Sequence, residues 1–239
     1  LEKYHPTRIL FLDIETVPRK SSFEELDEQE QEFWDKKSSR FRHEEETPAD
    51  VYSRAGIYAE FGKVICISVG LIVNKSGRYG FRIKSFYGDD EAALLSEFAQ
   101  MLEKFSEKEQ AYLCAHNGKE FDFPYIIRRL LINRLPVPEM LNVPGKKPWE
   151  VAFLDTLELW KFGDYKHYTS LSLLAHVFDI PTPKDDIDGS MVGQVYYEEN
   201  DLSRIVRYCE KDTLAVAQLF LRYRGEELID PDNVEYANE

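Results

Sequence analysis

The sequence predicts an α/β protein in which helices flank a mixed β-sheet. Short apolar segments typical of strands are separated by segments with helical periodicity, and this alternation favours a layered α/β fold. Two strand-like segments, residues 63–73 and 79–87, are joined by Asn74–Gly77 (NKSG), which is typical of a hairpin turn. A hairpin pairs its strands antiparallel, whereas helical connections favour parallel pairing, so we expect a mixed sheet.

The first predicted strand, Arg8–Ile14, is a continuous apolar run like those of central strands that are buried on both faces. Residues 21–49 are rich in charge and carry only a partial helical face, and we interpret them as an insertion that is partly helical or mobile. After the hairpin, the periodicity predicts further helices and strands. In chain order these are Asp89–Phe105 (helix), Ala111–Ala115 (strand), Phe123–Arg134 (helix), Val151–Leu154 (strand), Leu171–Phe178 (helix), Ser190–Tyr197 (short helix) and Leu202–Arg222 (helix).

The composition suits a single domain. With 239 residues and 43% hydrophobic residues, we assign one domain to residues 1–225, with the insertion at about 21–49 and an acidic tail at 226–239. No apolar run of about 18 residues occurs, so we expect no membrane partner. The three cysteines are odd in number and form no CxxC pair, which favours reduced thiols and the cytoplasm. The net charge of −14 disfavours a simple duplex-binding protein, although a sum can hide local patches.

Two carboxylates follow the apolar residues of ILFLDIET, at the predicted carboxyl end of the first strand. Side chains alternate along a strand, so Asp13 and Glu15 point to the same side. Acids this close repel each other and raise each other's pKa, and a divalent cation with oxygen ligands would remove that cost. The alternative is an ordinary turn with solvated acids.

Two later segments carry further candidate residues. His116–Pro124 (HNGKEFDFP) follows a predicted strand and begins a helix, where Asp122 could be a ligand or simply a helix cap, and Asn117–Gly118 could be only a turn. In YCEKD, Tyr208 and Asp212 lie four residues apart on one border of the apolar stripe of the last helix. Such a pair can face a cleft or lie on the surface.

In chain order the three motifs read DxE, NGxxFDxP and YxxxD. Together they resemble the DEDD superfamily of 3′–5′ exonucleases, in the subgroup with Tyr in the third motif. The sequence is most similar to the proofreading exonuclease domain of family-B DNA polymerases, and in particular to stand-alone bacterial predicted exonucleases of that kind. The resemblance covers about Arg8 to Arg224, apart from the insertion. It implies a ribonuclease H-like fold, with a five-stranded mixed sheet flanked by helices.

The resemblance also implies a two-metal-ion mechanism with Mg²⁺ or Mn²⁺ as cofactors. Asp13, Glu15, Asp122 and Asp212 would be the ligands, with Asp13 bridging both ions. Glu15 and Asp212 would hold the ion that binds the attacking water, and Asp122 would help to hold the ion at the leaving 3′ oxygen. Tyr208 would orient the water.

Other positions follow from the same resemblance. The histidine subgroup has His five residues before the last acid, where this chain has Arg207. Thr16, Asn117 and Phe121 match positions near the terminal nucleotide, although Phe121 could equally belong to the core. We interpret Asp155 as the cap of a helix at Thr156–Lys161.

The function implied is hydrolysis of single-stranded DNA or RNA from its 3′ end to 5′-mononucleotides, with DNA favoured. Lys146–Trp149 and Lys161–Tyr168 interleave basic and aromatic residues and could contact the strand or be solvated loops. The first alternative function is a catalytically silent nucleic-acid-binding module of the same fold. A second is a phosphatase of the haloacid dehalogenase type, whose DxDxT motif resembles DIET. Protein partners, such as a repair or maturation complex, cannot be read from the sequence.

Overall fold

The computed structural model describes residues 1–239 except 76, 109, 165–167, 182–186 and 238–239. Within this described part, one six-stranded sheet has the order β5-β4-β1-β2-β3-β6. The strands are β1 (Ile9–Pro18), β2 (Gly62–Lys75), β3 (Arg78–Tyr87), β4 (Tyr112–Ala115), β5 (Phe153–Asp155) and β6 (Val234–Tyr236). The predicted α/β class is confirmed. The strand count is one higher than predicted, because residues of the acidic tail form β6.

Strand directions agree with the predicted mixed sheet. β2 is antiparallel to both β1 and β3, whereas β4 is parallel to β1 and β5 is parallel to β4. β6 runs parallel to β3 and pairs through Phe81–Ile83. This central arrangement of β3-β2-β1-β4-β5 is the ribonuclease H-like one that the sequence motifs implied.

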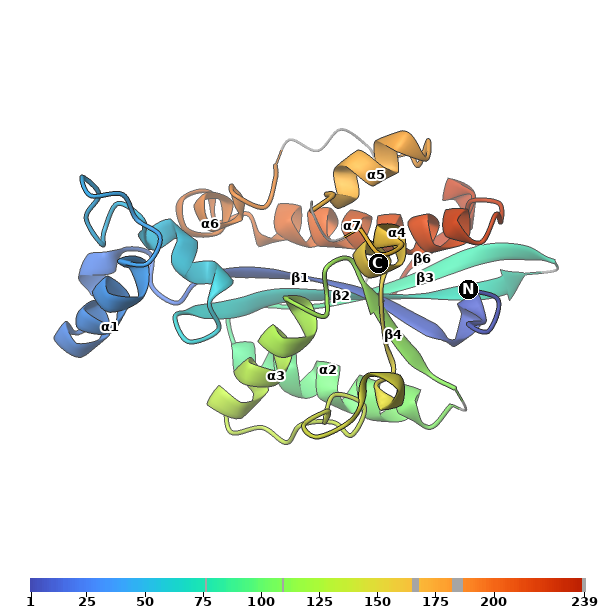
Figure 1. Ribbon diagram of the computed structural model, residues 1–239, viewed down its shortest axis with the longest axis horizontal. Helices are drawn as coiled ribbons and strands as arrows, with labels where there is room; N and C mark the ends of the chain where they lie inside the picture. Colours follow the sequence, from blue (N-terminus) through green and yellow to red (C-terminus); the bar gives the residue numbers. More distant parts are fainter. Residues whose placement is uncertain (76, 109, 165–167, 182–186, 238–239) are drawn as a thin grey trace.

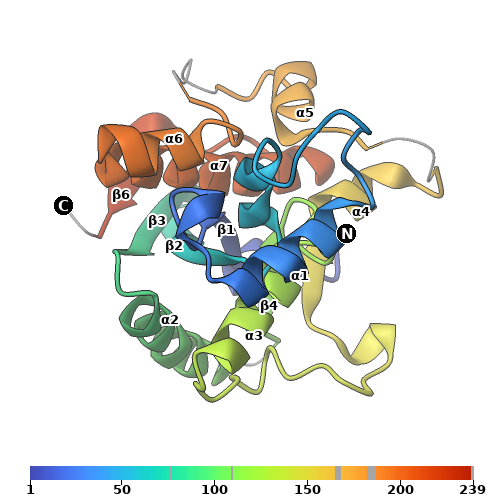
Figure 2. The same cartoon turned by 90° about the vertical axis from the view of Figure 1, so that its left-hand side faces the viewer.

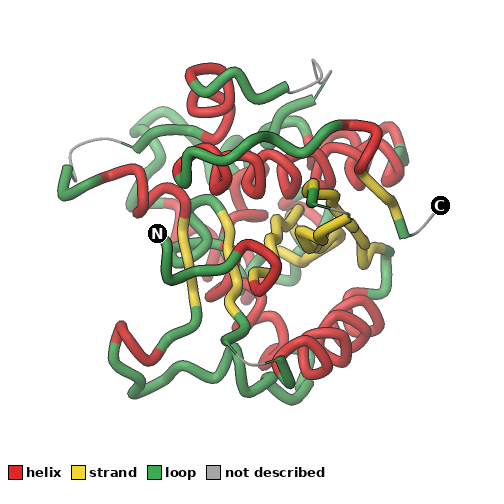
Figure 3. Tube along the Cα trace, turned by 90° about the vertical axis from the view of Figure 1, so that its right-hand side faces the viewer, coloured by secondary structure: helices red, strands yellow, loops and turns green. Residues whose placement is uncertain are grey.

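Helices cover both faces of the sheet, as Figure 1 shows. Figure 3, turned by 90° from that view, shows the strands lying between them. α2 and α3 lie against one face, where Leu10, Leu12 and Ile14 of β1 enter the core. α7 lies against the other face, where Ile9 and Phe11 of β1 pack with its apolar stripe. The helices are α1 (Glu28–Ser38), α2 (Glu91–Ser106), α3 (Asp122–Ile132), α4 (Thr156–Lys161), α5 (Leu171–Val177), α6 (Val192–Gln194) and α7 (Leu202–Tyr223). Among the described residues, no helix combines the length and apolar character that crossing a bilayer requires.

β1 continues beyond the predicted end at Ile14. Its main chain stays paired with β2 as far as Pro18, and Val17 is fully buried. The parallel neighbour β4 pairs only with Ile9–Phe11. The prediction that the acids end their own strand was therefore wrong. Asp13 and Glu15 instead lie beyond the residues of β1 that pair with β4. Next to these two acids, the edge of β1 that faces β4 is therefore not paired with β4.

The insertion forms an ordered helical unit at the end of the molecule where β1 finishes, as Figure 2 shows. α1 begins with a capping box between Asp27 and Glu30. Trp34 is fully buried, and its ring contacts the aromatic rings of Phe41, Tyr52, Tyr58 and Phe61. Of the two alternatives for residues 21–49, the helical one is correct.

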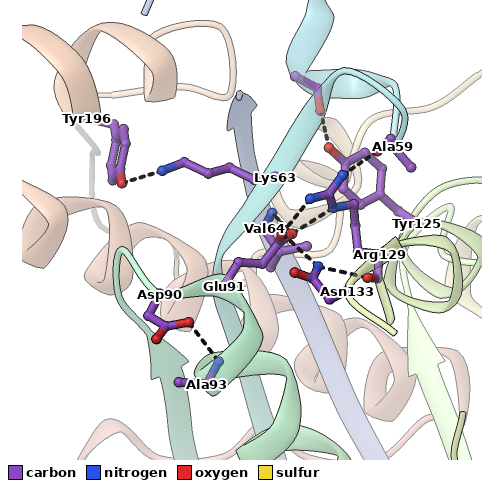
Figure 4. Close-up of polar contacts among 11 residues, drawn as sticks. Ala59, Lys63, Val64, Asp90, Glu91, Ala93, Tyr125, Arg129, Asn133 and Tyr196 are labelled. Carbon is purple, nitrogen blue, oxygen red and sulfur yellow. Dashed lines mark hydrogen bonds and ion pairs between the residues drawn. The ribbon is translucent and has the colours of Figure 1, made fainter. Parts of the chain in front are cut away.

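A buried ion pair fixes the helices on one face to the sheet, and Figure 4 shows its contacts. Glu91 of α2 accepts hydrogen bonds from Nε of Arg129 on α3 and from the main-chain N–H of Val64 on β2, each at 2.8 Å. Arg129 also donates to the main-chain oxygen of Ala59, and the hydroxyl of Tyr125 donates to that of Gly56, each at 2.7 Å. These contacts hold the segment between the insertion and β2 against α3 and the start of β2.

Candidate active site

β1 supplies the first two acids. Asp13 and Glu15 lie two residues apart before a register shift between Glu15 and Thr16, and both experience the charge of Asp212 on α7. Ligand atoms of Asp13, Glu15 and Cys209 all lie within 4.8 Å of one another. The Sγ of Cys209 donates to the main-chain oxygen of Asp13 at 3.3 Å, so α7 lies directly against the strand that carries the acids.

α7 places its two predicted site residues on the border of its buried face. Asp201 caps the helix by accepting from the main-chain N–H of Arg204 at 3.0 Å, as predicted. Tyr208 and Asp212 are half-buried, whereas Cys209 between them is fully buried. The hydroxyl of Tyr208 lies close to the carboxylate of Asp212, one helical turn further along α7.

A tight loop delivers the fourth acid. Asn117 has a φ of 62°, a left-handed conformation that Asn tolerates. A Cβ on Gly118 would lie 2.4 Å from the Cβ of Ala115, so only glycine fits there. The loop ends at Asp122, which is the first residue of α3 and is buried. The main chain of Ile14 lies near its carboxylate, so Asp122 lies beside β1.

The charges of Asp122 and Asp212 act on both Asp13 and Glu15 of β1. Burial raises the pKa of Asp13, and the charges of Glu15, Asp212 and Asp122 raise it further. Burial likewise raises the pKa of Glu15, with smaller contributions from Asp212, Cys66 and Asp122. The pKa of Asp122 is raised to about 7, mainly by burial.

The pKa of the Tyr208 hydroxyl is raised by burial first and then by the charges of Asp212, Glu15 and Asp13. The structure therefore brings all five predicted catalytic residues together.

This donor set fits hard divalent cations. Buried carboxylates that repel one another are costly, and a cation offsets that cost. Carboxylate oxygens are ligands that Mg²⁺ and Mn²⁺ prefer. Cys209 is close enough to be a ligand, but burial raises its pKa and its thiol donates to Asp13. A protonated thiol is not a metal ligand, so the fit rests on the carboxylates.

The three predicted substrate-contact residues are Thr16 on β1 and Asn117 and Phe121 in the loop before α3. The side chain of Thr16 lies near the hydroxyl of Tyr125, on the α3 side of the sheet. Phe121 is partly buried, packs against the core on that side and contacts the ring of Tyr125, with centroids 5.4 Å apart. The core alternative for Phe121 is therefore supported. Asn117 is half-buried in the loop before α3.

Asp155 is confirmed as the cap of α4, and it has a second role that sequence reasoning missed. Its Oδ1 accepts from the main-chain N–H of Leu157 at 2.9 Å. Its two carboxylate oxygens also accept from the main-chain N–H groups of Asn117 and Lys119, at 2.9 and 3.0 Å. One buried carboxylate thus joins α4 to the loop that delivers Asp122. An acid at the end of a short strand was the only signal for it in the sequence.

Asp13, Tyr208 and Asp212 line a cleft with a volume of about 880 Å³, and His116 and Tyr168 line it too. Of the predicted strand-contact segment Lys161–Tyr168, residues 165–167 lie outside the described part. Trp149 of the other segment is near Tyr112, at the amino ends of β4 and β5. It therefore lies at the opposite end of these strands from the acids, which favours the solvated-loop alternative for this segment.

A comparison with protein-family models matches residues 57–235 to a family described as a predicted 3′–5′ exonuclease related to the exonuclease domain of PolB. No curated protein matches the chain. The matched segment contains Asp122, Tyr208 and Asp212. Asp13 and Glu15 precede it, so their link to the site comes from the geometry alone.

Proposed function

Because the chain belongs to the family of predicted 3′–5′ exonucleases related to the exonuclease domain of PolB, we propose that it is a metal-dependent 3′–5′ exonuclease. It hydrolyses single-stranded nucleic acid to 5′-mononucleotides, and DNA is favoured over RNA by the relation to PolB. The observation that carries the proposal is the convergence of Asp13, Glu15, Asp122 and Asp212 beside the hydroxyl of Tyr208.

The four carboxylates would hold two divalent cations, Mg²⁺ or Mn²⁺. When bound, such ions stabilise the attacking and the leaving oxygen of an in-line displacement at phosphorus. The Tyr208 hydroxyl contributes as a hydrogen-bond donor that orients the attacking water. Its pKa is raised by burial and by the surrounding acids, so it keeps its proton at neutral pH and does not act as the base.

The loop contacts contribute positioning. Asp155 fixes the main chain at Asn117 and Lys119 while it also caps α4. These bonds reduce the reorganisation that the site needs when a strand enters. We place the protein in the cytoplasm because all three of its cysteines are buried and free.

Product analysis with Asp13→Asn tests the proposal. Matched DNA and RNA oligonucleotides labelled at the 5′ or the 3′ end are incubated with Mn²⁺ or with a chelator. The parent should remove nucleotides from the 3′ end as 5′-mononucleotides, and only when metal is present. Asp13→Asn should release none while remaining folded. If Asp13→Asn degrades the strand at the parental rate, the assignment of the site is wrong. Strand binding in chelator together with no turnover in metal would favour a silent binding module instead.

A further inference from the structure

Tyr168 is an aromatic residue of the cleft to which the motifs give no role. Its side chain is 63% exposed, and it lines the same cleft as Asp13 and Asp212. An exposed tyrosine at the border of an acidic site is either an ordinary surface residue or a contact for a ligand that enters the cleft.

His116 fixes the chain beside Tyr168. Its Nε2 lies 2.9 Å from the main-chain oxygen of Thr169, and its Nδ1 lies 2.9 Å from the hydroxyl of Thr156. A carbonyl oxygen can only accept, so Nε2 carries the proton and Nδ1 accepts from Thr156. Burial lowers the pKa of His116, which favours this neutral form. The ring of Tyr168 then meets the His116 ring edge-on, with centroids 6.2 Å apart and an interplanar angle of 70°.

Tyr168 is close enough to the acids to experience their charges. Burial raises its pKa, and the charges of Asp122, Asp155 and Asp13 raise it further. The residue as a whole is mostly exposed. An exposed aromatic residue thus lies in the cleft, and His116 contacts it edge-on.

We propose that Tyr168 is the platform on which the base of the 3′-terminal nucleotide stacks. The inference rests on the proposed function, since that function brings a strand end to the carboxylates. Stacking uses the π-face that every base has, so it suits an enzyme that must accept each base in turn. A stacked base would also hold the terminal nucleotide without adding cations to an acidic cleft.

A double-mutant cycle between protein and ligand tests the inference. Binding in chelator is measured by fluorescence anisotropy for a single-stranded oligonucleotide and for the same oligonucleotide with an abasic 3′-terminal residue. Tyr168→Ala should weaken binding of the first by about 5–150-fold, the usual effect of one lost base stack, and leave binding of the abasic strand unchanged. Tyr168→Phe should bind both like the parent, because it keeps the ring. Trp149→Ala is the matched control, since Trp149 is 77% exposed but lies at the far end of β4 and β5.

A second readout is the fluorescence of 2-aminopurine at the 3′ terminus. The parent and Tyr168→Phe should quench it on binding, and Tyr168→Ala should not. Equal losses with the normal and the abasic strand, a loss with Tyr168→Phe as large as with Tyr168→Ala, or no strand binding by the parent would each overturn the inference.

The two proposals fail separately. If the parent releases mononucleotides with Mn²⁺ but Tyr168→Ala shows no dependence on the terminal base, the exonuclease stands and the stacking does not. If the base-dependent loss is present but Mn²⁺ produces no mononucleotides, the stacking platform stands and the exonuclease does not.

Discussion

The carboxylate of Asp155 accepts a hydrogen bond of 2.9 Å from the main-chain N–H of Asn117, across 38 residues of sequence. Its other oxygen accepts from the N–H of Lys119. The loop that delivers Asp122 is therefore held by the residue that caps α4, in addition to the contacts within the loop itself.

Asp155→Asn should lower the free energy of unfolding by about 1–3 kcal/mol. The amide that replaces one carboxylate oxygen is a donor, and it would meet an N–H of the loop or of α4. Denaturant unfolding measures the loss, and Glu97→Gln on the exposed face of α2 is a control. An unchanged midpoint would show that the loop does not depend on this carboxylate.

Tyr208→Phe should reduce kcat by about 10²–10³-fold, the usual effect of removing one hydrogen-bond donor from a reacting centre. The ring is kept and the carboxylates are untouched, so stabilisation by Mn²⁺ should persist. Steady-state kinetics on a labelled strand and a thermal melt with Mn²⁺ separate the two effects. A parental kcat would remove Tyr208 from the mechanism.

Asp122→Asn should stabilise the metal-free protein at pH 8. In the folded chain Asp122 has a pKa of about 7, raised by burial from its usual value of 3.8. The stability that its protonated form contributes is complete below about pH 4 and is lost as the pH rises through about 7. Asparagine has no charge to bury, so the difference in Tm between variant and parent should grow between pH 5 and 8, by roughly 2–4 °C for each kcal/mol gained. A difference in Tm between variant and parent that shrinks as the pH rises would contradict this prediction.

Mn²⁺ should raise the Tm of the parent in chelator-free buffer. A ligand at 100 times its Kd stabilises the folded state by about 2.7 kcal/mol. Asp13→Asn should lose most of this gain, because Asp13 lies among the other acids. Equal gains in both proteins would place the metal elsewhere.

Trp34→Ala should destabilise the insertion, by about 3–5 kcal/mol for the loss of a fully buried large side chain. Limited proteolysis should then cut within residues 21–49 at a protease concentration that the parent resists. Phe33→Ala is the matched control, because the neighbouring ring is 56% exposed. Equal resistance of Trp34→Ala and the parent would mean that the aromatic cluster does not hold the insertion together.

Local patterns predicted most of the fold. The stripe of α7, its Asp201 cap and the border position of Tyr208 all follow from helical periodicity, which depends on residues within one helix. The end of β1 was predicted wrongly because an acid was treated as a strand terminator. Here the acids remain within the strand while Val17 beyond them is buried.

Long-range contacts account for what the sequence did not predict. Asp155 could be recognised as a cap from its neighbours, but its bonds to the loop depend on the packing of β4 beside β5. No motif gives Glu210 of YCEKD a role, yet it is buried and accepts from the hydroxyl of Ser85 on β3 at 2.7 Å. β6 is too short and too polar to give a periodic signal.

The acidic tail closes one margin of the sheet. β6 covers Phe81–Ile83 in the middle of β3, and the uncovered parts of β3 carry Arg78 and Lys84. At the opposite margin β5 has only three residues. Neither margin therefore offers a long, bare row of main-chain donors and acceptors to a strand from another molecule, so each copy of this protein is protected against joining its neighbours sheet to sheet.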